Sequence, residues 1–158
     1  EGESTWVDIS GLIGQYAHGN EPSHHIAHLY NYVGQPWRTQ EIVDEVLHTL
    51  YFNNPDGLSG NEDCGQMSAW YILNAMGFYQ VCPGKPVYSI GRPLFNEATV
   101  HLKDGKSFKV IAHNNSRDNK YVRSIVLNGN KLETPFFTHQ DIVDGGTLEL
   151  TMGSEPLK

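Results

Sequence analysis

The segment Gly19–His28 holds one acid and three of the chain's eight histidines, residue types that could bind a metal ion or a sugar. If the segment is helical, Glu21 shares a face with His24 and His25, because residues three and four apart are neighbours on a helix. His24 and His28 share a face for the same reason. Histidines four apart suit zinc, and an acid three residues before a histidine is one element of a di-iron bundle. A metal centre is therefore one interpretation of this segment.

The start of the same segment is also typical of a helix N-terminus. Asn20 or Ser23 could cap the first turn, Pro22 is favoured in that turn, and a Glu21 carboxylate suits the positive end of the helix dipole. The oxygen-rich pair Asn20 and Glu21 would suit calcium better than a soft metal. The residue types alone leave capping and ligand binding both open.

A second candidate segment runs from Gly57 to Gln66 and places two adjacent acids, Glu62 and Asp63, after two glycines. Glycines allow a backbone to approach a ligand closely, and a carboxylate where a loop meets a helix is well placed to orient a water. Asp63 and Gln66 also fit a capping box, in which the acid caps the helix and the glutamine bonds back. A capped carboxylate is also a positioned one, so both interpretations stand.

Aromatic and cysteine side chains accompany the two segments. The aromatic residues could stack on sugar rings, although a helical core is their commoner setting: Trp37, Trp70, Tyr71, Phe78 and Tyr79. We expect Cys64 to be structural rather than a nucleophile, because a neighbouring negative charge disfavours a thiolate. Spacing alone does not establish a disulfide between Cys64 and Cys82.

The elements that must position these residues change character near residue 78. Before it, apolar residues follow helical spacing, which predicts helices over 24–33, 37–51 and 64–76. A Gly-Gln-Pro break and a turn cluster near Pro55 separate them. After residue 78 the apolar period shifts toward two, which predicts strands.

Two strand pairs in this second half are joined by hairpin signals. Asp104-Gly105 separates 99–102 from 107–111, and Asn128-Gly129 follows the strand 121–127. A last strand is expected over 147–152, preceded by one helical turn over 137–143. Helices followed by antiparallel strands indicate segregated layers rather than an alternating α/β sheet, and hence an α+β protein.

Composition bounds the class of protein. The chain has 158 residues, 39% apolar and 18% charged, which is enough to build a packed core of one domain or little more. A net charge of −7 argues against nucleic-acid binding, and no apolar run is long enough to span a membrane. The chain begins at Glu1 with no signal segment, so we expect a mature product or an excised piece.

Three stretches carry a specific likeness, and Gly77–Tyr79 and Tyr88–Phe95 extend it: Gly11–Tyr32, Gly34–Gln40 and Gly60–Tyr71. Together they resemble glycoside hydrolase family 92, whose members are calcium-dependent, exo-acting α-mannosidases. The likeness covers essentially the whole chain but only the C-terminal portion of the longer family proteins. It implies the last helices of an α/α toroid, built of helical hairpins, over 1–77, and an antiparallel β-rich segment over 78–158.

The resemblance also implies catalytic roles for the second segment. The family hydrolyses α-mannosides with inversion, so one acid protonates the leaving oxygen and one base activates water. The family motif places the general base on Asp63, which we expect to be a carboxylate near its ordinary pKa. Asn61 stands where some relatives carry an aspartate; it cannot act as a base, but its amide can hold water. Glu62 is expected to support substrate binding.

The first segment would bind the sugar and calcium. The family motif falls on Asn20, Glu21, Pro22 and His25, and it implies sugar contacts from Asn20, Glu21, His24 and His25, with Glu21 also beside calcium. Calcium would hold sugar hydroxyls as a Lewis acid and template. Some members specific for α-1,2 linkages have His at the position of Asn20, so the linkage stays open.

The catalytic acid of the family is expected upstream of this chain. Glu1–Trp6 echoes the acid-bearing motif but lies too close to Glu21 for the family's spacing. The resemblance therefore implies that the chain alone is inactive and needs the missing N-terminal part of the same enzyme. It further implies a mannose-containing glycan as substrate and a secreted, periplasmic or cell-surface location.

Two other functions compete with this one. A free-standing carbohydrate-binding module would bind mannose through its aromatic residues without hydrolysing it. A small metalloprotein would hold zinc or iron through Glu21, His24 and His28.

Overall fold

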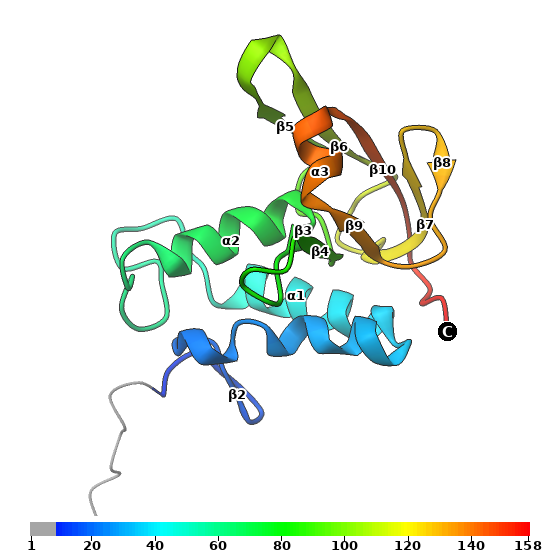
Figure 1. Cartoon of the computed structure of the whole chain (residues 1–158). Helices are drawn as coiled ribbons and strands as arrows, with labels where there is room; N and C mark the ends of the chain where they lie inside the picture. The colour runs from blue at the N-terminus through cyan, green and yellow to red at the C-terminus, as the bar shows by residue number, and fades with distance from the viewer. Residues whose placement is uncertain (1–8) are drawn as a thin grey trace, which may run out of the picture.

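The computed structural model describes residues 9–158 (Figure 1). The Glu1–Trp6 segment lies outside these residues, so the expectation that it does not supply the catalytic acid stays a prediction. A two-stranded hairpin opens the described chain, with β1 (Leu12–Ile13) paired antiparallel to β2 (Tyr16–Ala17). Helices follow and then strands, and in Figure 1 the later strands, coloured light green to red, lie at the upper right of the view. The predicted α+β class is confirmed.

Four helices form the first half: η1 (Glu21–Ser23), η2 (Ile26–Val33), α1 (Pro36–Thr49) and α2 (Gln66–Met76). The break between η2 and α1 is as expected, with Gly34 left-handed at φ 72° and Pro36 in the first turn of α1. None of the helices in residues 9–158 is long and apolar enough to cross a membrane.

The first predicted helix winds as a 3₁₀ helix rather than an α-helix. The buried side chains of η2 include two polar residues, His28 and Asn31, and both bond to Ser89 Oγ of strand β4 (Val87–Ile90), at 3.1 and 2.7 Å. A 3₁₀ run of eight residues is unusual. Side chains three residues apart eclipse in a 3₁₀ helix, so this winding lets His28 and Asn31 reach the same hydroxyl.

Two sheets form the second half. A small sheet has the order β3-β4-β9, and a five-stranded sheet has the order β5-β6-β10-β7-β8. The helical turn predicted near 137–143 is strand β9 followed by helix α3 (His139–Asp144). The remaining strands are β3 (Phe78–Tyr79), β5 (Glu97–His101), β6 (Ser107–His113), β7 (Tyr121–Leu127), β8 (Asn130–Lys131), β9 (Phe136–Thr138) and β10 (Gly146–Gly153).

Both predicted hairpins are present, because each turn dipeptide adopts the positive φ that it requires. Asp104 and Gly105 have φ of 60° and 73°, and Asn128 and Gly129 have φ of 49° and 78°. One strand pair differs from the expected antiparallel arrangement: β10 lies between β6 and β7, antiparallel to β7 but parallel to β6. Alternating burial gives β10 one buried face but carries no information on the direction of its partner strands.

The hydrophobic core has two clusters. The cluster among the helices contains Ala27, Val43, Val46, Leu47 and Trp70, and the second fills the space between the two sheets and α3. Residues on either side of position 77 cross between the clusters, since Tyr79 packs on the helical cluster and Leu73 on the sheet cluster. The domain boundary after residue 77 stays a prediction.

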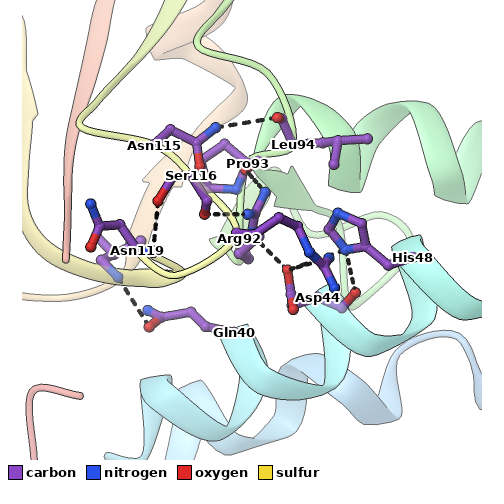
Figure 2. A network of polar contacts seen from close by, with 11 residues as sticks. Gln40, Asp44, His48, Arg92, Pro93, Leu94, Asn115, Ser116 and Asn119 are labelled. Atoms are coloured by element: carbon purple, nitrogen blue, oxygen red, sulfur yellow. Dashed lines mark hydrogen bonds and ion pairs between the residues drawn. The ribbon is translucent and has the colours of Figure 1, made fainter. Parts of the chain in front are cut away.

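A buried polar network joins α1 to the sheet half (Figure 2). The Arg92 Nε atom lies 2.9 Å from Asp44 Oδ1, and Arg92 also donates to Ser116 O at 2.9 Å. The backbone N–H of Val122 donates to Gln40 Oε1 at 3.1 Å. These contacts fix the helices against the strands and so hold the helical part of the candidate site in place.

Candidate active site

Asp63 sits in a turn of left-handed residues immediately before α2. Asp63, Cys64 and Gly65 have φ of 48°, 56° and 92°. The first two are unfavourable for residues with a Cβ, which is typical of functional sites. The capping box predicted between Asp63 and Gln66 is wrong, because left-handed Gly65 occupies the N-cap of α2 and no side chain caps it. The Asp63 carboxylate is exposed and free of a capping role.

Glu62 anchors this turn to α2. Its Oε1 accepts the Ser68 backbone N–H at 3.1 Å, and its Oε2 accepts the Ser68 hydroxyl at 3.0 Å. Both carboxylate oxygens are therefore occupied by the first turn of the helix. Asn61, one residue earlier, is exposed in the loop.

Glu21 begins the 3₁₀ helix η1 and faces the Asp63 turn. Pro22 lies in the first turn as expected, but the predicted cap is absent: Asn20 occupies the N-cap without a side-chain hydrogen bond. The Glu21 Oε1 atom is buried and accepts no hydrogen bond from an N–H or hydroxyl group among residues 9–158. Burying a carboxylate oxygen without a hydrogen-bond donor costs free energy, so this oxygen is available to a cation or a donor group of a ligand.

The carboxyl group of Asp63 lies within hydrogen-bonding reach of Glu21. Hydrogen bonding with Glu21 is the largest cause of a raised pKa at Asp63, followed by loss of solvation and repulsion from the Glu21 charge. The expectation of a carboxylate near its ordinary pKa is therefore corrected: Asp63 holds a proton to higher pH than a free aspartate. A proton, a cation or a substrate hydroxyl between the two groups would satisfy both.

The neighbouring histidines differ in what they offer. His25 is exposed, whereas His24 and His28 are buried. The ring nitrogens of His28 are bonded to Ser89 Oγ and, at 2.7 Å, to Asn74 Oδ1. Within residues 9–158, no three or more His, Cys, Asp or Glu side chains gather as a metal site. The zinc or iron centre of Glu21, His24 and His28 does not fit this arrangement.

Sequence reasoning missed a buried network around His18. Tyr16 OH donates to His18 Nδ1 at 2.8 Å, and His18 Nε2 donates to Tyr51 OH at 2.6 Å. The direction is fixed because Tyr51 OH donates onward to Met67 O at 3.0 Å. Burial, with a smaller effect of His24, lowers the pKa of His18 to about 3. The partners lie up to 33 residues away in the chain, so no local motif could reveal them.

The aromatic residues divide as the commoner interpretation expects. Trp70 and Phe78 are fully buried in the core, so neither offers a face to a sugar. Trp37, Tyr71 and Tyr79 are half-buried. Cys64 and Cys82 are exposed free thiols, and no disulfide joins them.

A pocket of about 490 Å³ lies between the 51–58 turn and α2. Its walls include Tyr51, Ser68, Tyr71 and Ile72, but neither Glu21 nor Asp63. The pocket is thus separate from Glu21 and Asp63, although its wall includes Ser68, the hydrogen-bond partner of Glu62.

Glycoside hydrolases use carboxyl groups as acids and bases. The arrangement of this site fits that class, because Asp63 is a carboxylate on a strained turn beside a second acid, and the turn belongs to the helices that pack against the sheets. The family model described as the glycosyl hydrolase family 92 catalytic domain matches residues 1–154. The chain belongs to glycosyl hydrolase family 92.

Individual relatives agree with this assignment. A family 92 α-mannosidase from Bacteroides thetaiotaomicron is 46% identical, with a TM-score of 0.89 over 94% of this chain and 20% of its own. An inverting mannosidase of the same family and organism is 50% identical, with a TM-score of 0.84 over 90% of this chain and 19% of its own. An uncharacterised secreted glycosidase from Arthroderma benhamiae is 31% identical over 87% of this chain and 18% of its own. The chain thus spans about a fifth of the length of these relatives.

Proposed function

We propose that this chain supplies the water-activating carboxylate and part of the sugar site of an exo-acting α-mannosidase that works with inversion. The observation that carries the proposal is the exposed Asp63 carboxylate, held on a left-handed turn against Glu21. The relatives support the substrate class: one is an inverting mannosidase, and another structure of an α-mannosidase holds mannoimidazole.

Asp63 is the better candidate for the base of the two acids. Its side chain is open to solvent, where a water can reach it, whereas the Glu21 Oε1 atom is buried. A raised pKa also makes Asp63 a stronger base than a free aspartate, and a base is most effective when its pKa approaches the working pH. Asn61, exposed two residues earlier, can help to hold the water through its amide.

Glu21 and Asp63 do not form the acid and base pair of the reaction. An inverting glycosidase separates these groups by about 6.5–9.5 Å to admit a sugar and a water. Groups in hydrogen-bonding contact are far closer than that. We therefore assign the catalytic acid to the N-terminal part of the enzyme.

Asn20, Glu21 and His25 are the proposed direct sugar contacts. Asn20 makes no cap bond and His25 is exposed, so both have free hydrogen-bonding groups. Glu62 and His24 have a supporting role without direct sugar contact, because both oxygens of Glu62 and both ring nitrogens of His24 are bonded within the protein. The substrate is a mannose-containing glycan, and one relative's name supports a secreted enzyme.

Calcium fits this site if other parts of the enzyme supply some of its ligands. The unpartnered Glu21 Oε1 atom is the hard oxygen donor that calcium prefers. Calcium takes about 6–8 oxygens, and residues 9–158 gather no group of three or more acidic, Cys or His side chains that could hold a metal. We propose that Glu21 contributes to a calcium site completed by other parts of the enzyme. The ion would supply a Lewis acid that holds sugar hydroxyls.

A graft tests the proposal. The matching segment of the 46%-identical Bacteroides α-mannosidase is replaced by this chain, and mannose release from an aryl α-mannoside is measured. We expect an active graft that loses activity on calcium chelation and regains it with added calcium. Asp63→Asn should lower kcat by about 10²–10⁴-fold, because a positioned base contributes that much.

Asp56→Asn is the matched control, since Asp56 is an exposed aspartate in the turn just before. It should leave kcat unchanged. An active graft in which Asp63→Asn matches Asp56→Asn would refute the assignment of the base.

A further inference from the structure

Gln66 connects the two segments that carry the carboxyl pair. Its backbone N–H donates to Asp63 O at 3.1 Å and closes the left-handed turn. Its side-chain Nε2 lies 3.0 Å from His24 Nδ1. The backbone N–H of His24 donates in turn to Glu21 O at 2.9 Å. Hydrogen bonds therefore link Asp63 to Glu21 through Gln66 and His24.

The chemistry of the partners fixes the direction of these bonds. His24 Nε2 lies 3.0 Å from the carbonyl oxygen of His18, which can only accept, so Nε2 carries the proton. Nδ1 of the neutral ring must then accept from the Gln66 amide. The second amide hydrogen of Gln66 serves Tyr79 OH at 3.2 Å. The Gln66 NH₂ group is thus fully used, with both hydrogens directed to groups outside its own helix.

The turn needs such an external hold. Non-glycine residues in the left-handed region, here Asp63 and Cys64, persist only where the surroundings determine the conformation. Glu62 fixes the turn to α2, but to nothing in the Glu21 segment. Trp70 donates to His24 O at 3.0 Å from one turn further along α2, deep in the core. Gln66 is the side chain that makes this link beside the carboxyl pair.

We propose that Gln66 is a positioning residue, which sets the placement of Asp63 relative to Glu21 by bridging His24 and Tyr79. The proposal rests on the function proposed for Asp63 and adds a residue that touches neither sugar nor water. Its amide acts through the two segments, so its loss should displace the base without removing any group that binds the sugar.

Gln66→Met tests this, because methionine has a similar length and no hydrogen-bonding amide. In the grafted mannosidase we expect kcat to fall about 10- to 100-fold, since a displacement near 1 Å can cost about 10²-fold. KM should change by less than about threefold, because sugar contacts are retained. A crystal structure of the 158-residue variant should show the Asp63 and Glu21 carboxyl groups out of contact.

Gln140→Met is the matched control, since Gln140 is exposed on α3 and bonds only to Asp144 among the described residues. It should leave kcat, KM and the carboxyl contact unchanged. If Met at position 66 prevents folding, Gln66→Asn keeps an amide but loses its reach, and the same changes are expected.

A carboxyl contact preserved in the variant structure, or a kcat within twofold of wild type, would overturn the proposal. The structural measurement stands even if Asp63 is not the base. Failure of the positioning claim is therefore distinguishable from failure of the proposed function, which the Asp63→Asn graft decides.

Discussion

Asp63 combines exposure, a left-handed backbone and a carboxyl partner, and these features together are the reason that we propose it as the base. Its raised pKa and its solvent access are consequences of one arrangement, the approach of Glu21 to a turn that leaves Asp63 free of capping. The buried histidines nearby do different work, because their ring nitrogens are committed to the protein.

His28 should make stability depend on pH. Burial, partly offset by the bond to Asn74, lowers its pKa from 6.5 to about 4. The unfolded chain therefore binds a proton that the folded chain refuses, so the free energy of unfolding is full above about pH 6.5 and falls as the pH drops toward 4. A shift of this size corresponds to a loss on the order of 3 kcal/mol.

Urea denaturation between pH 7 and pH 4 measures this loss. We expect a shallower pH dependence in His28→Gln, which cannot titrate there, than in His101→Gln, whose histidine is exposed at the end of β5. Equal pH dependence in the two variants would contradict the assignment of a neutral, buried His28.

The roles that the motifs imply for Asp63 and Glu21 stay predictions, although the structure brings the two residues together. The expectations that it contradicts are those that depend on backbone conformation. The capping box failed because three consecutive left-handed residues move the N-cap to Gly65, and no short-range spacing encodes such a run. The His18 and Gln66 networks were missed because their partners come together only in the folded chain.

At the scale of elements, helix α1 connects the helices that carry the site to the sheets. Its Asp44 pairs with Arg92, whose side chain is only 2% exposed, and the pair lies between α1 and the loop that follows β6. Removing one partner of a buried ion pair leaves the other charge uncompensated.

Asp44→Asn should therefore lower the free energy of unfolding by about 3–5 kcal/mol. Glu97→Gln is the matched control, because Glu97 pairs with Lys109 at the same 2.9 Å but in solvent. Its loss should cost about 0–1 kcal/mol. Urea denaturation at neutral pH compares the two, and similar costs would show that the Asp44 pair is not a structural link.

The elements themselves were largely predictable. Apolar spacing found α1 and α2, and the Asp-Gly and Asn-Gly dipeptides found both hairpins, because each signal is local. The parallel pairing of β10 with β6 was not predictable, since the same alternation of buried residues fits either direction. The 3₁₀ winding of η2 accompanies bonds to Ser89, which lies some sixty residues further along the chain, so no local pattern could show them.

At the scale of the whole molecule, we propose that the chain presents one side of a reaction centre. It matches about a fifth of the length of its relatives, and the carboxyl pair that it contributes is too close to enclose a sugar and a water. Several apolar side chains are exposed on the helices, among them Leu29, Val33 and Ile72. We expect the sugar pocket to be completed by sequence beyond the described residues.

Rescue of an Asp63→Ala graft by azide tests the central claim most directly. Alanine leaves room at the site of the water, and azide needs no base to attack the anomeric carbon while the glycosidic C–O bond breaks. The account predicts that azide restores turnover of an aryl α-mannoside and yields the β-mannosyl azide, observed by NMR. Hydrolysis at the wild-type rate without azide, or turnover that azide fails to raise, would contradict a base at position 63.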